Sequence, residues 1–233
     1  SRIEANRIVG SRDMVVWYSG GNTITGNEVA GGRYGTHFMY SHDNLVTGNR
    51  YVGNVVGIFA MYSRGLTLER NLLAASTGAA GMGLGLKESS AVTVRDNALV
   101  QNAVGIYFDN SPFEPGQLNT IAGNAIELCD LGIQFHASTR GNRLRGNRLH
   151  GNGAQVRVDG GGDALGNEWA GNDFDDYAGY DLDHDGVGDV PYEANDLIDR
   201  LQVRYPAMAL LMGSPSVQAL RLVGQQFPVL RVP

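Results

Sequence analysis

An asparagine recurs along this chain at intervals of 22 to 27 residues, each time closing a short polar segment such as TGN, ERN or RGN. The series comprises Asn27, Asn49, Asn71, Asn97, Asn124, Asn147 and Asn172. A second series has a similar period and begins with glycine, in GTHFMYS, GIFAMYS, GLGLKES, GIYFDNS and GIQFHAS. Self-similarity at a period of about 20 to 50 residues is typical of solenoids, in which each repeat stacks on the next. We therefore expect stacked coils rather than one central core.

The segments between these markers indicate short strands, because they are rich in valine, isoleucine and leucine and mostly lack a helical period. Glycine and asparagine suit the corners, since both tolerate left-handed backbone angles. The sequence predicts an all-β protein with a right-handed, single-stranded parallel β-helix over residues 1–192 and a short, mostly helical C-terminal cap over 193–233. An antiparallel sandwich is the main alternative, but its turns would recur about every 8–12 residues. A leucine-rich repeat would need a regular leucine frame that is absent.

Alignment of the glycine-led segments separates inward from outward positions, because alternate residues of a strand face opposite sides. Two columns are almost wholly apolar, as a filled interior requires: Thr36, Ile58, Leu84, Ile106 and Ile133, and then Phe38, Ala60, Leu86, Phe108 and Phe135. The intervening columns face outward: His37, Phe59, Gly85, Tyr107 and Gln134, and then Met39, Met61, Lys87, Asp109 and His136. Trp17, one turn earlier, is in line with Met39.

Three outward residues suggest a site for a soft metal ion. His37 and Met39 are two residues apart on one strand, about 6.6 Å, and Met61 lies one coil on, about 4.8 Å away. Thioether and imidazole groups suit Cu(I), whereas cations that prefer carboxylates would ignore them. His42 follows at the corner as a fourth candidate copper ligand. The alternative is that the methionines pack beneath a covering loop.

Lys87, Asp109 and His136 continue the same outward column. They are interpreted as a charge ladder between coils. The alternative function is a β-helical polysaccharide-binding protein, lyase or epimerase, in which a base and a cation in a groove would act on a sugar chain. No pair of carboxylates of the glycosidase type occurs in the repeats, which weakens this alternative.

An acidic segment, DLDHDGVGD, follows the repeats. Four aspartates occupy positions 1, 3, 5 and 9 of an EF-hand-like loop: Asp181, Asp183, Asp185 and Asp189. Glycine is at position 6, and Val187 at position 7 would contribute its carbonyl. Position 12 is Tyr192 rather than glutamate. We expect a calcium ion here; the alternative is an acidic, solvated turn.

Composition argues against several classes of function. The 233 residues carry a net charge of −6, which does not suggest a nucleic-acid surface. No uninterrupted run of 18 apolar residues is present, so no membrane span is predicted. Cys129 is the single cysteine and is expected to pack in the interior. The apolar stretch from Tyr205 to Leu222 exceeds what one coil end requires, so we expect it to contact a partner.

Four motifs in order resemble the NosD family over essentially the whole chain: GRYGTHFMYSHDN, VVGIFAMYSR, GLGLKES and FDDYAGYDLDHDGVGDVPY. The resemblance implies a periplasmic protein that works with an ABC transporter, composed of a permease and an ATPase. It also implies that copper arrives from a membrane-anchored copper chaperone and passes to nitrous oxide reductase. No catalytic residues are implied, so we expect a copper-handling protein rather than an enzyme. Because the chain begins mid-repeat, at SRIEANRIVG, we expect a fragment or a trimmed protein.

Overall fold

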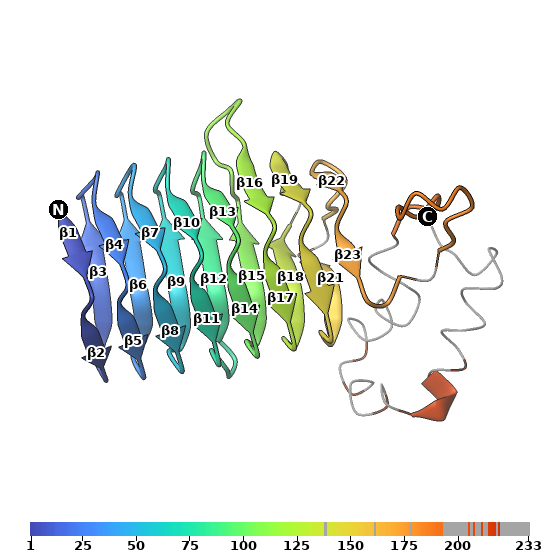
Figure 1. Ribbon diagram of the computed structural model, residues 1–233, viewed down its shortest axis with the longest axis horizontal. Helices are drawn as coiled ribbons and strands as arrows, with labels where there is room; N and C mark the ends of the chain where they lie inside the picture. Colours follow the sequence, from blue (N-terminus) through green and yellow to red (C-terminus); the bar gives the residue numbers. More distant parts are fainter. Residues whose placement is uncertain are drawn as a thin grey trace. The chain divides into compact units, whose positions relative to one another are not determined.

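The computed structural model describes residues 1–137, 139–160, 162–177 and 179–192, together with 205, 207, 211, 214–217 and 219. The chain divides into two compact units, Ser1–Asp175 and Asp176–Pro233. The first unit is an all-β parallel β-helix of about seven turns (Figure 1), which confirms the fold class predicted from the repeat. The right-handed coiling of the β-helix and a domain boundary after residue 192 remain predictions. The cap predicted for 193–233 and its docking stretch lie almost wholly outside the described residues.

Each coil contributes three short strands, one to each of three parallel sheets. The first sheet runs in the order β1 (Arg2–Glu4), β4 (Thr23–Thr25), β7 (Leu45–Thr47), β10 (Thr67–Glu69), β13 (Thr93–Arg95), β16 (Asn119–Ala122), β19 (Asn142–Arg145) and β22 (Glu168–Ala170). The second runs in the order β2 (Arg7–Val9), β5 (Glu28–Ala30), β8 (Arg50–Val52), β11 (Leu72–Ala74), β14 (Ala98–Val100), β17 (Ala125–Glu127), β20 (Arg148–His150) and β23 (Asp173–Phe174). The third runs in the order β3 (Asp13–Trp17), β6 (Tyr34–Met39), β9 (Val56–Met61), β12 (Met82–Lys87), β15 (Val104–Asp109), β18 (Leu131–His136) and β21 (Ala154–Asp159).

The recurring asparagines form a ladder of hydrogen bonds along one corner. Nδ2 of Asn27 donates to Oδ1 of Asn49 at 2.9 Å, and Asn49 donates in the same way to Asn71 at 3.0 Å. The ladder continues through Asn97, Asn124, Asn147 and Asn172. Each Oδ1 also accepts a backbone N–H from the preceding coil, as Asn49 does from Asn27 at 2.9 Å. Buried polar groups need such partners, which explains why asparagine recurs at this position.

The inward columns fill the interior as predicted. Phe38 and Phe108 are fully buried, which confirms the register on which the outward columns depend. The one polar member of these columns, Thr36, donates its hydroxyl hydrogen to the buried Tyr51 hydroxyl oxygen at 2.9 Å. A hydroxyl can therefore occupy this position because its hydrogen-bond partner also lies in the interior of the β-helix.

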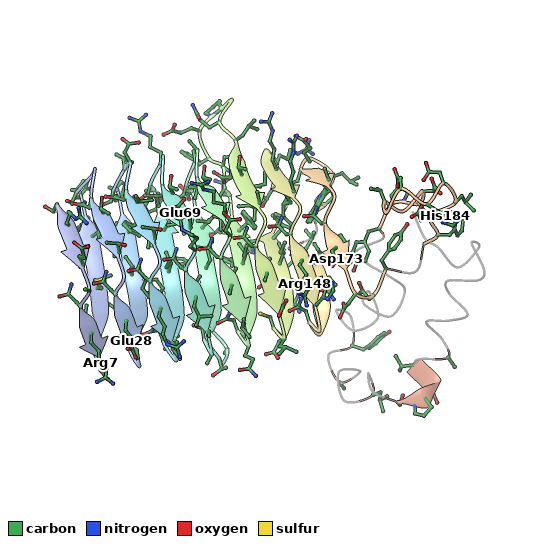
Figure 2. All side chains as sticks on the ribbon, viewed as in Figure 1. Arg7, Glu28, Glu69, Arg148, Asp173 and His184 are labelled. Atoms are coloured by element: carbon green, nitrogen blue, oxygen red, sulfur yellow. The ribbon has the colours of Figure 1, made fainter. Side chains whose placement is uncertain are left out.

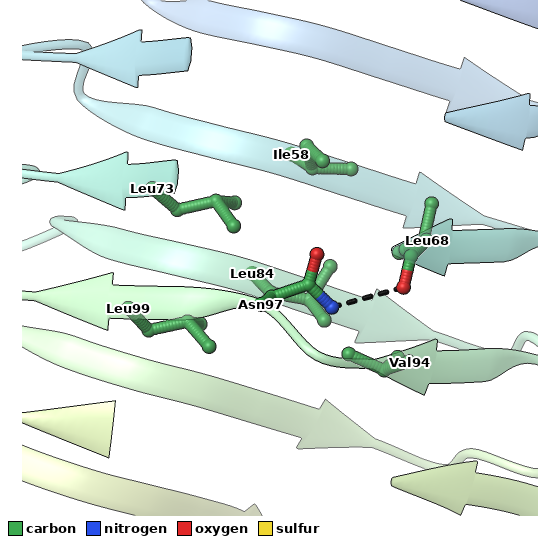
Figure 3. A pocket seen from close by; sticks show the side chains of 7 residues that line it. All are labelled: Ile58, Leu68, Leu73, Leu84, Val94, Asn97 and Leu99. Carbon is green, nitrogen blue, oxygen red and sulfur yellow. Dashed lines mark hydrogen bonds between the residues drawn. The ribbon is translucent and has the colours of Figure 1, made fainter. Parts of the chain in front are cut away.

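Figure 3 shows the interior near the middle of the β-helix. Six apolar side chains converge beside Asn97: Ile58, Leu68, Leu73, Leu84, Val94 and Leu99. Nδ2 of Asn97 donates to the backbone oxygen of Leu68 at 2.9 Å, so the one polar side chain in this group is paired. Within the described parts of the chain, no helix is long and apolar enough to cross a membrane.

Candidate metal centre

The outer face of the third sheet holds three of the predicted copper ligands. In β6, Phe38 is buried whereas His37 and Met39 are partly exposed, as the alternation of a strand requires. The next strand, β9, repeats this arrangement, and its register places Met61 directly beside Met39. Trp17 on β3 pairs with Met39 from the other side, as the alignment predicted. One imidazole and two thioethers thus lie on neighbouring strands of one face.

His37 lies against Met61, with its Nε2 atom 3.3 Å from the Met61 Sδ. Burial lowers the pKa of His37; the nearby carboxylate of Asp13 opposes this shift, and the guanidinium of Arg33 adds to it. The lowered pKa favours the neutral form of the imidazole. Neutral imidazole is the form that binds a metal ion, because a ligating nitrogen must have a free lone pair.

The donor set favours soft cations. An ion between Nε2 of His37 and Sδ of Met61 would require the imidazole tautomer with its proton on Nδ1. Thioether sulfur selects Cu(I) among the common biological cations and offers little to calcium or magnesium. Because the three side chains are only partly buried, an ion held there would be open to solvent on one side.

His42 lies at the corner that follows β6. Its Nδ1 atom accepts a hydrogen bond from the backbone N–H of Arg64 in the next coil, at 3.2 Å. The imidazole of His42 thus contacts the backbone of the neighbouring corner rather than the other three predicted ligands.

Two aromatic rings flank His37. The ring of Tyr34 is 4.7 Å from the imidazole between centroids, and that of Phe59 is 5.9 Å away. The alignment placed Phe59 on the outer face but did not identify Tyr34, which strict alternation would turn inward with Thr36. The alternation breaks at Gly35, where a Cβ would lie 2.5 Å from the backbone oxygen of Gly57. That glycine is the signal from which the exception could have been suspected.

A third thioether also lies on this face. A Cβ at Gly85 would be 2.2 Å from Cδ2 of Phe59 and 2.8 Å from Sδ of Met82, so the ring and the sulfur both lie over this glycine. Gly85 pairs with Phe59 in the outward column. Met82 was not identified from the sequence because it is outside the aligned columns. The glycine at position 85 was a signal, because a residue without a side chain in the outward column leaves space for a neighbouring side chain.

Beyond the third coil the outer face becomes ionic. Nζ of Lys87 lies 2.6 Å from Oδ2 of Asp109, and this hydrogen bond raises the pKa of Lys87. His136 follows Asp109 in register. Gln134 donates a hydrogen bond to Asp159 on the last strand of the sheet. The predicted charge ladder is therefore present at Lys87 and Asp109, whereas His136 is an exposed neighbour.

The acidic loop belongs to the second compact unit, and His184 marks it in Figure 2. Three of its carboxylates offer oxygens within 4.8 Å of one another: those of Asp181, Asp183 and Asp189. The carboxylate of Asp185 is not part of this group, and it accepts the backbone N–H of Val187 at 2.7 Å; the three grouped carboxylates also accept backbone N–H groups of the loop. The structure thus gathers three of the four predicted aspartate ligands.

A family model described as "Periplasmic copper-binding protein (NosD)" matches residues 1–179. The chain belongs to the NosD family. Two curated relatives are each named "Probable ABC transporter binding protein NosD". The relative from Stutzerimonas stutzeri is 40% identical over 119 residues, covering 49% of this chain and 27% of the relative. The relative from Pseudomonas aeruginosa is 38% identical over 145 residues, covering 59% of this chain and 32% of the relative. The matched part therefore spans about a third, at most, of these NosD proteins.

Solved structures share the β-helix of this NosD-family chain. The periplasmic alginate epimerase AlgG is 25% identical with a TM-score of 0.50, covering 59% of this chain and 32% of AlgG. The A-module of the mannuronan C-5 epimerase AlgE6 from Azotobacter vinelandii is 16% identical with a TM-score of 0.53, covering 74% of this chain and 57% of the module. The second likeness shows the fold alone.

Cys129 is the remaining soft donor to consider in a copper-binding family. The side chain is buried, and burial raises the pKa of its thiol. The burial of Cys129 fits the packing role expected from the sequence.

Proposed function

We propose that this chain binds Cu(I) on the outer face of the third sheet, through His37, Met39 and Met61 with His42 as a fourth ligand. The observation that carries the proposal is the 3.3 Å contact between Nε2 of His37 and Sδ of Met61, with Met39 in register beside Met61. The family description as periplasmic and copper-binding supports copper as the ion. The proposed site is a place of transfer, because the side chains of His37, Met39 and Met61 are only partly buried and leave one side of the ion open to solvent, whereas a site closed on every side would release the ion slowly.

The chain then acts as part of a periplasmic accessory protein in the maturation of nitrous oxide reductase. It receives copper from a membrane-anchored copper chaperone, works with an ABC transporter of permease and ATPase, and passes copper to the reductase. The names of the two curated relatives support the transporter as partner. The protein performs no reaction of its own in this proposal, so copper is cargo and the chemistry is ligand exchange.

Anaerobic titration with Cu(I) against a competing chelator tests the site. The double variant Met39→Ala, Met61→Ala should lose about a hundredfold or more in affinity, since loss of outer-shell partners alone costs about 10- to 100-fold. Met14→Ala is the matched control, because it removes a thioether from the same sheet at the irregular pairing between Asp13 and Val15, outside the column of Met39 and Met61. Equal affinity of the wild type and the double variant would refute the site. His42→Ala measures the contribution of the fourth ligand.

We further propose that the acidic loop binds one calcium ion through Asp181, Asp183, Asp185, Val187 and Asp189. Carboxylates crowded within 4.8 Å of one another repel unless a cation offsets their charge. Oxygen donors suit calcium, whereas the soft Cu(I) prefers the thioethers of the other site. The two proposed sites therefore select different ions.

A second candidate function is binding of an acidic oligosaccharide along the ionic part of the outer face. The paired Lys87 and Asp109, with His136 beside them, are the observation in its favour. The likeness to the alginate epimerase AlgG adds weight. Saturable binding of an oligouronate, abolished by Lys87→Met, would favour this function over copper transfer.

A further inference from the structure

A series of contacts leads to His37 from outside the proposed ligand set, and it begins with an ion pair between neighbouring coils. Arg33 donates from Nε to Oδ1 of Asp13 at 2.9 Å and from Nη2 to Oδ2 at 2.5 Å. Such bidentate pairs fix the plane of the guanidinium as well as its position. The Asp13 side chain is only 12% exposed, so Arg33 meets a carboxylate that solvent reaches on few sides.

The guanidinium of Arg33 in turn lies over an aromatic ring. Its central carbon is 4.8 Å from the centroid of the Tyr34 ring, within the range of a cation–π contact. Two further neighbours of this ring belong to the candidate metal centre: the imidazole of His37, 4.7 Å away, and the ring of Phe59, 5.7 Å away. The Tyr34 ring is therefore held by contacts from its own coil, through Arg33 and His37, and from the next coil, through Phe59.

These contacts restrict the imidazole. A histidine on the outer face of a strand can adopt several side-chain rotamers, and most of them would turn Nε2 away from the next strand. With Tyr34 and Phe59 against it, the ring of His37 places Nε2 3.3 Å from Sδ of Met61. Outer-shell groups commonly fix the orientation of a metal-binding imidazole in this way.

We propose that Tyr34, clamped by the Asp13–Arg33 ion pair, is a positioning residue that holds the His37 imidazole with Nε2 directed at the Met61 sulfur. The inference rests on the proposed copper site, but the positioning itself is a property of the metal-free protein. Tyr34 touches no copper in this account. Its ring supplies the restraint, so phenylalanine should replace it and an aliphatic side chain should not.

The first test uses the metal-free protein. Nuclear Overhauser effects between the His37 ring protons and the Met61 methyl group should be present in the wild type and in Tyr34→Phe, and lost in Tyr34→Leu. Tyr18→Leu is the matched control. Tyr18 lies at the corner beside this face and stacks on Tyr40, with 5.0 Å between ring centroids. Persistence of the effects in Tyr34→Leu would overturn the inference and leave the proposed function standing.

The second test measures Cu(I) affinity in a double-mutant cycle. Tyr34→Leu should weaken binding about three- to tenfold, the equivalent of one aromatic contact, and Tyr34→Phe should restore it. The loss should disappear in a His37→Ala background, because positioning acts only through the imidazole. An equal loss in both backgrounds would mean general damage to the face and would overturn the inference.

Arg33→Met should weaken Cu(I) binding in the same direction as Tyr34→Leu. Its matched control is Arg7→Met, which breaks an exposed pair with Glu28 on the second sheet, 3.8 Å between Nε and Oε2 (Figure 2). Absence of any Cu(I) binding by the wild type would refute the proposed function itself, and with it the role of Tyr34 in binding copper. An affinity of Arg33→Met that is no lower than that of Arg7→Met would count against the clamp.

Discussion

At the scale of single residues, burial separates the packing side chains from the candidate ligands. Phe108 is fully buried and stacks on Phe135 with 4.9 Å between ring centroids. Phe113, five residues later, is 56% exposed in the loop that follows β15. A phenylalanine side chain is therefore expected to contribute much to the free energy of unfolding at position 108 and little at position 113.

Phe108→Ala should lower the free energy of unfolding by about 3–5 kcal/mol, because it leaves a cavity in a rigid interior. Phe113→Ala, the control, should change it by about 0.5 kcal/mol or less. Urea unfolding followed by circular dichroism measures both. Similar small effects in the two variants would contradict the inward register.

Cys129 should resist alkylation in the folded protein. Burial raises the pKa of its thiol, so the reactive thiolate is scarce at pH 7 and forms only as the pH rises above the ordinary range of a cysteine. Iodoacetamide labelling, followed by mass spectrometry at pH 7 and pH 9, should be slow in native protein and fast in guanidinium chloride. Rapid labelling of native protein at pH 7 would mean that the thiol is accessible and a candidate copper ligand.

At the scale of the elements, the strands are short and the corners carry much of the specificity. Each strand of the first two sheets has two to four residues, so few backbone hydrogen bonds join neighbouring coils there. The hydrogen bonds of the asparagine ladder add further links between the same coils. Asn97 shows the arrangement. Its Oδ1 accepts from the backbone N and Nδ2 of Asn71, and its Nδ2 donates to Leu68 O.

Asn97→Ala should lower the free energy of unfolding by about 3 kcal/mol or more, since each buried group left without a partner costs about 1–3 kcal/mol. Gln117→Ala, in an exposed loop, is the amide control and should have little effect. Thermal melts of the two variants provide the comparison. A small effect of Asn97→Ala would show that water replaces the ladder.

The acidic loop should be stabilised by calcium. Ligand binding to the folded form raises its stability in proportion to the logarithm of ligand concentration over the dissociation constant. Melting of the second unit should therefore shift upward with added calcium and return with chelator. Asp181→Asn, Asp183→Asn should abolish the shift, whereas Asp163→Asn, outside the loop, should retain it. Unchanged melting and no heat in calorimetry would leave the loop as an acidic surface.

Strand periodicity also defines what the sequence could reveal about the site. The columns that place His37, Met39 and Met61 outward follow from alternation and from apolar neighbours, and the register confirms them. Tyr34 was missed because the alternation of the strand fails near Gly35. Met82 was missed because the sequence does not indicate which side chain occupies the space above Gly85. The contact between His37 and Met61 depends on side-chain rotamers, which a repeat pattern does not specify.

At the scale of the whole molecule, one face of the β-helix carries two kinds of chemistry. Its first three coils present imidazole, thioether and aromatic groups beside the Asp13–Arg33 ion pair, and its later coils present the charged pair of Lys87 and Asp109. The repeat explains this division, because stacking fixes the interior of every coil while leaving each outward position free to vary. The parallel β-helix was thus predictable from the repeat, whereas the partners of this face are not encoded in any periodicity.

The most direct measurement of the central claim is an anomalous difference map from crystals of the protein loaded anaerobically with Cu(I), collected at the copper absorption edge. The proposed function predicts a peak on the outer face of the third sheet, within bonding distance of His37 Nε2, Met39 Sδ and Met61 Sδ. Crystals of the Met39→Ala, Met61→Ala variant, prepared in the same way, should lack that peak. Copper found only elsewhere in the wild type, or no ordered copper at all, would contradict the claim.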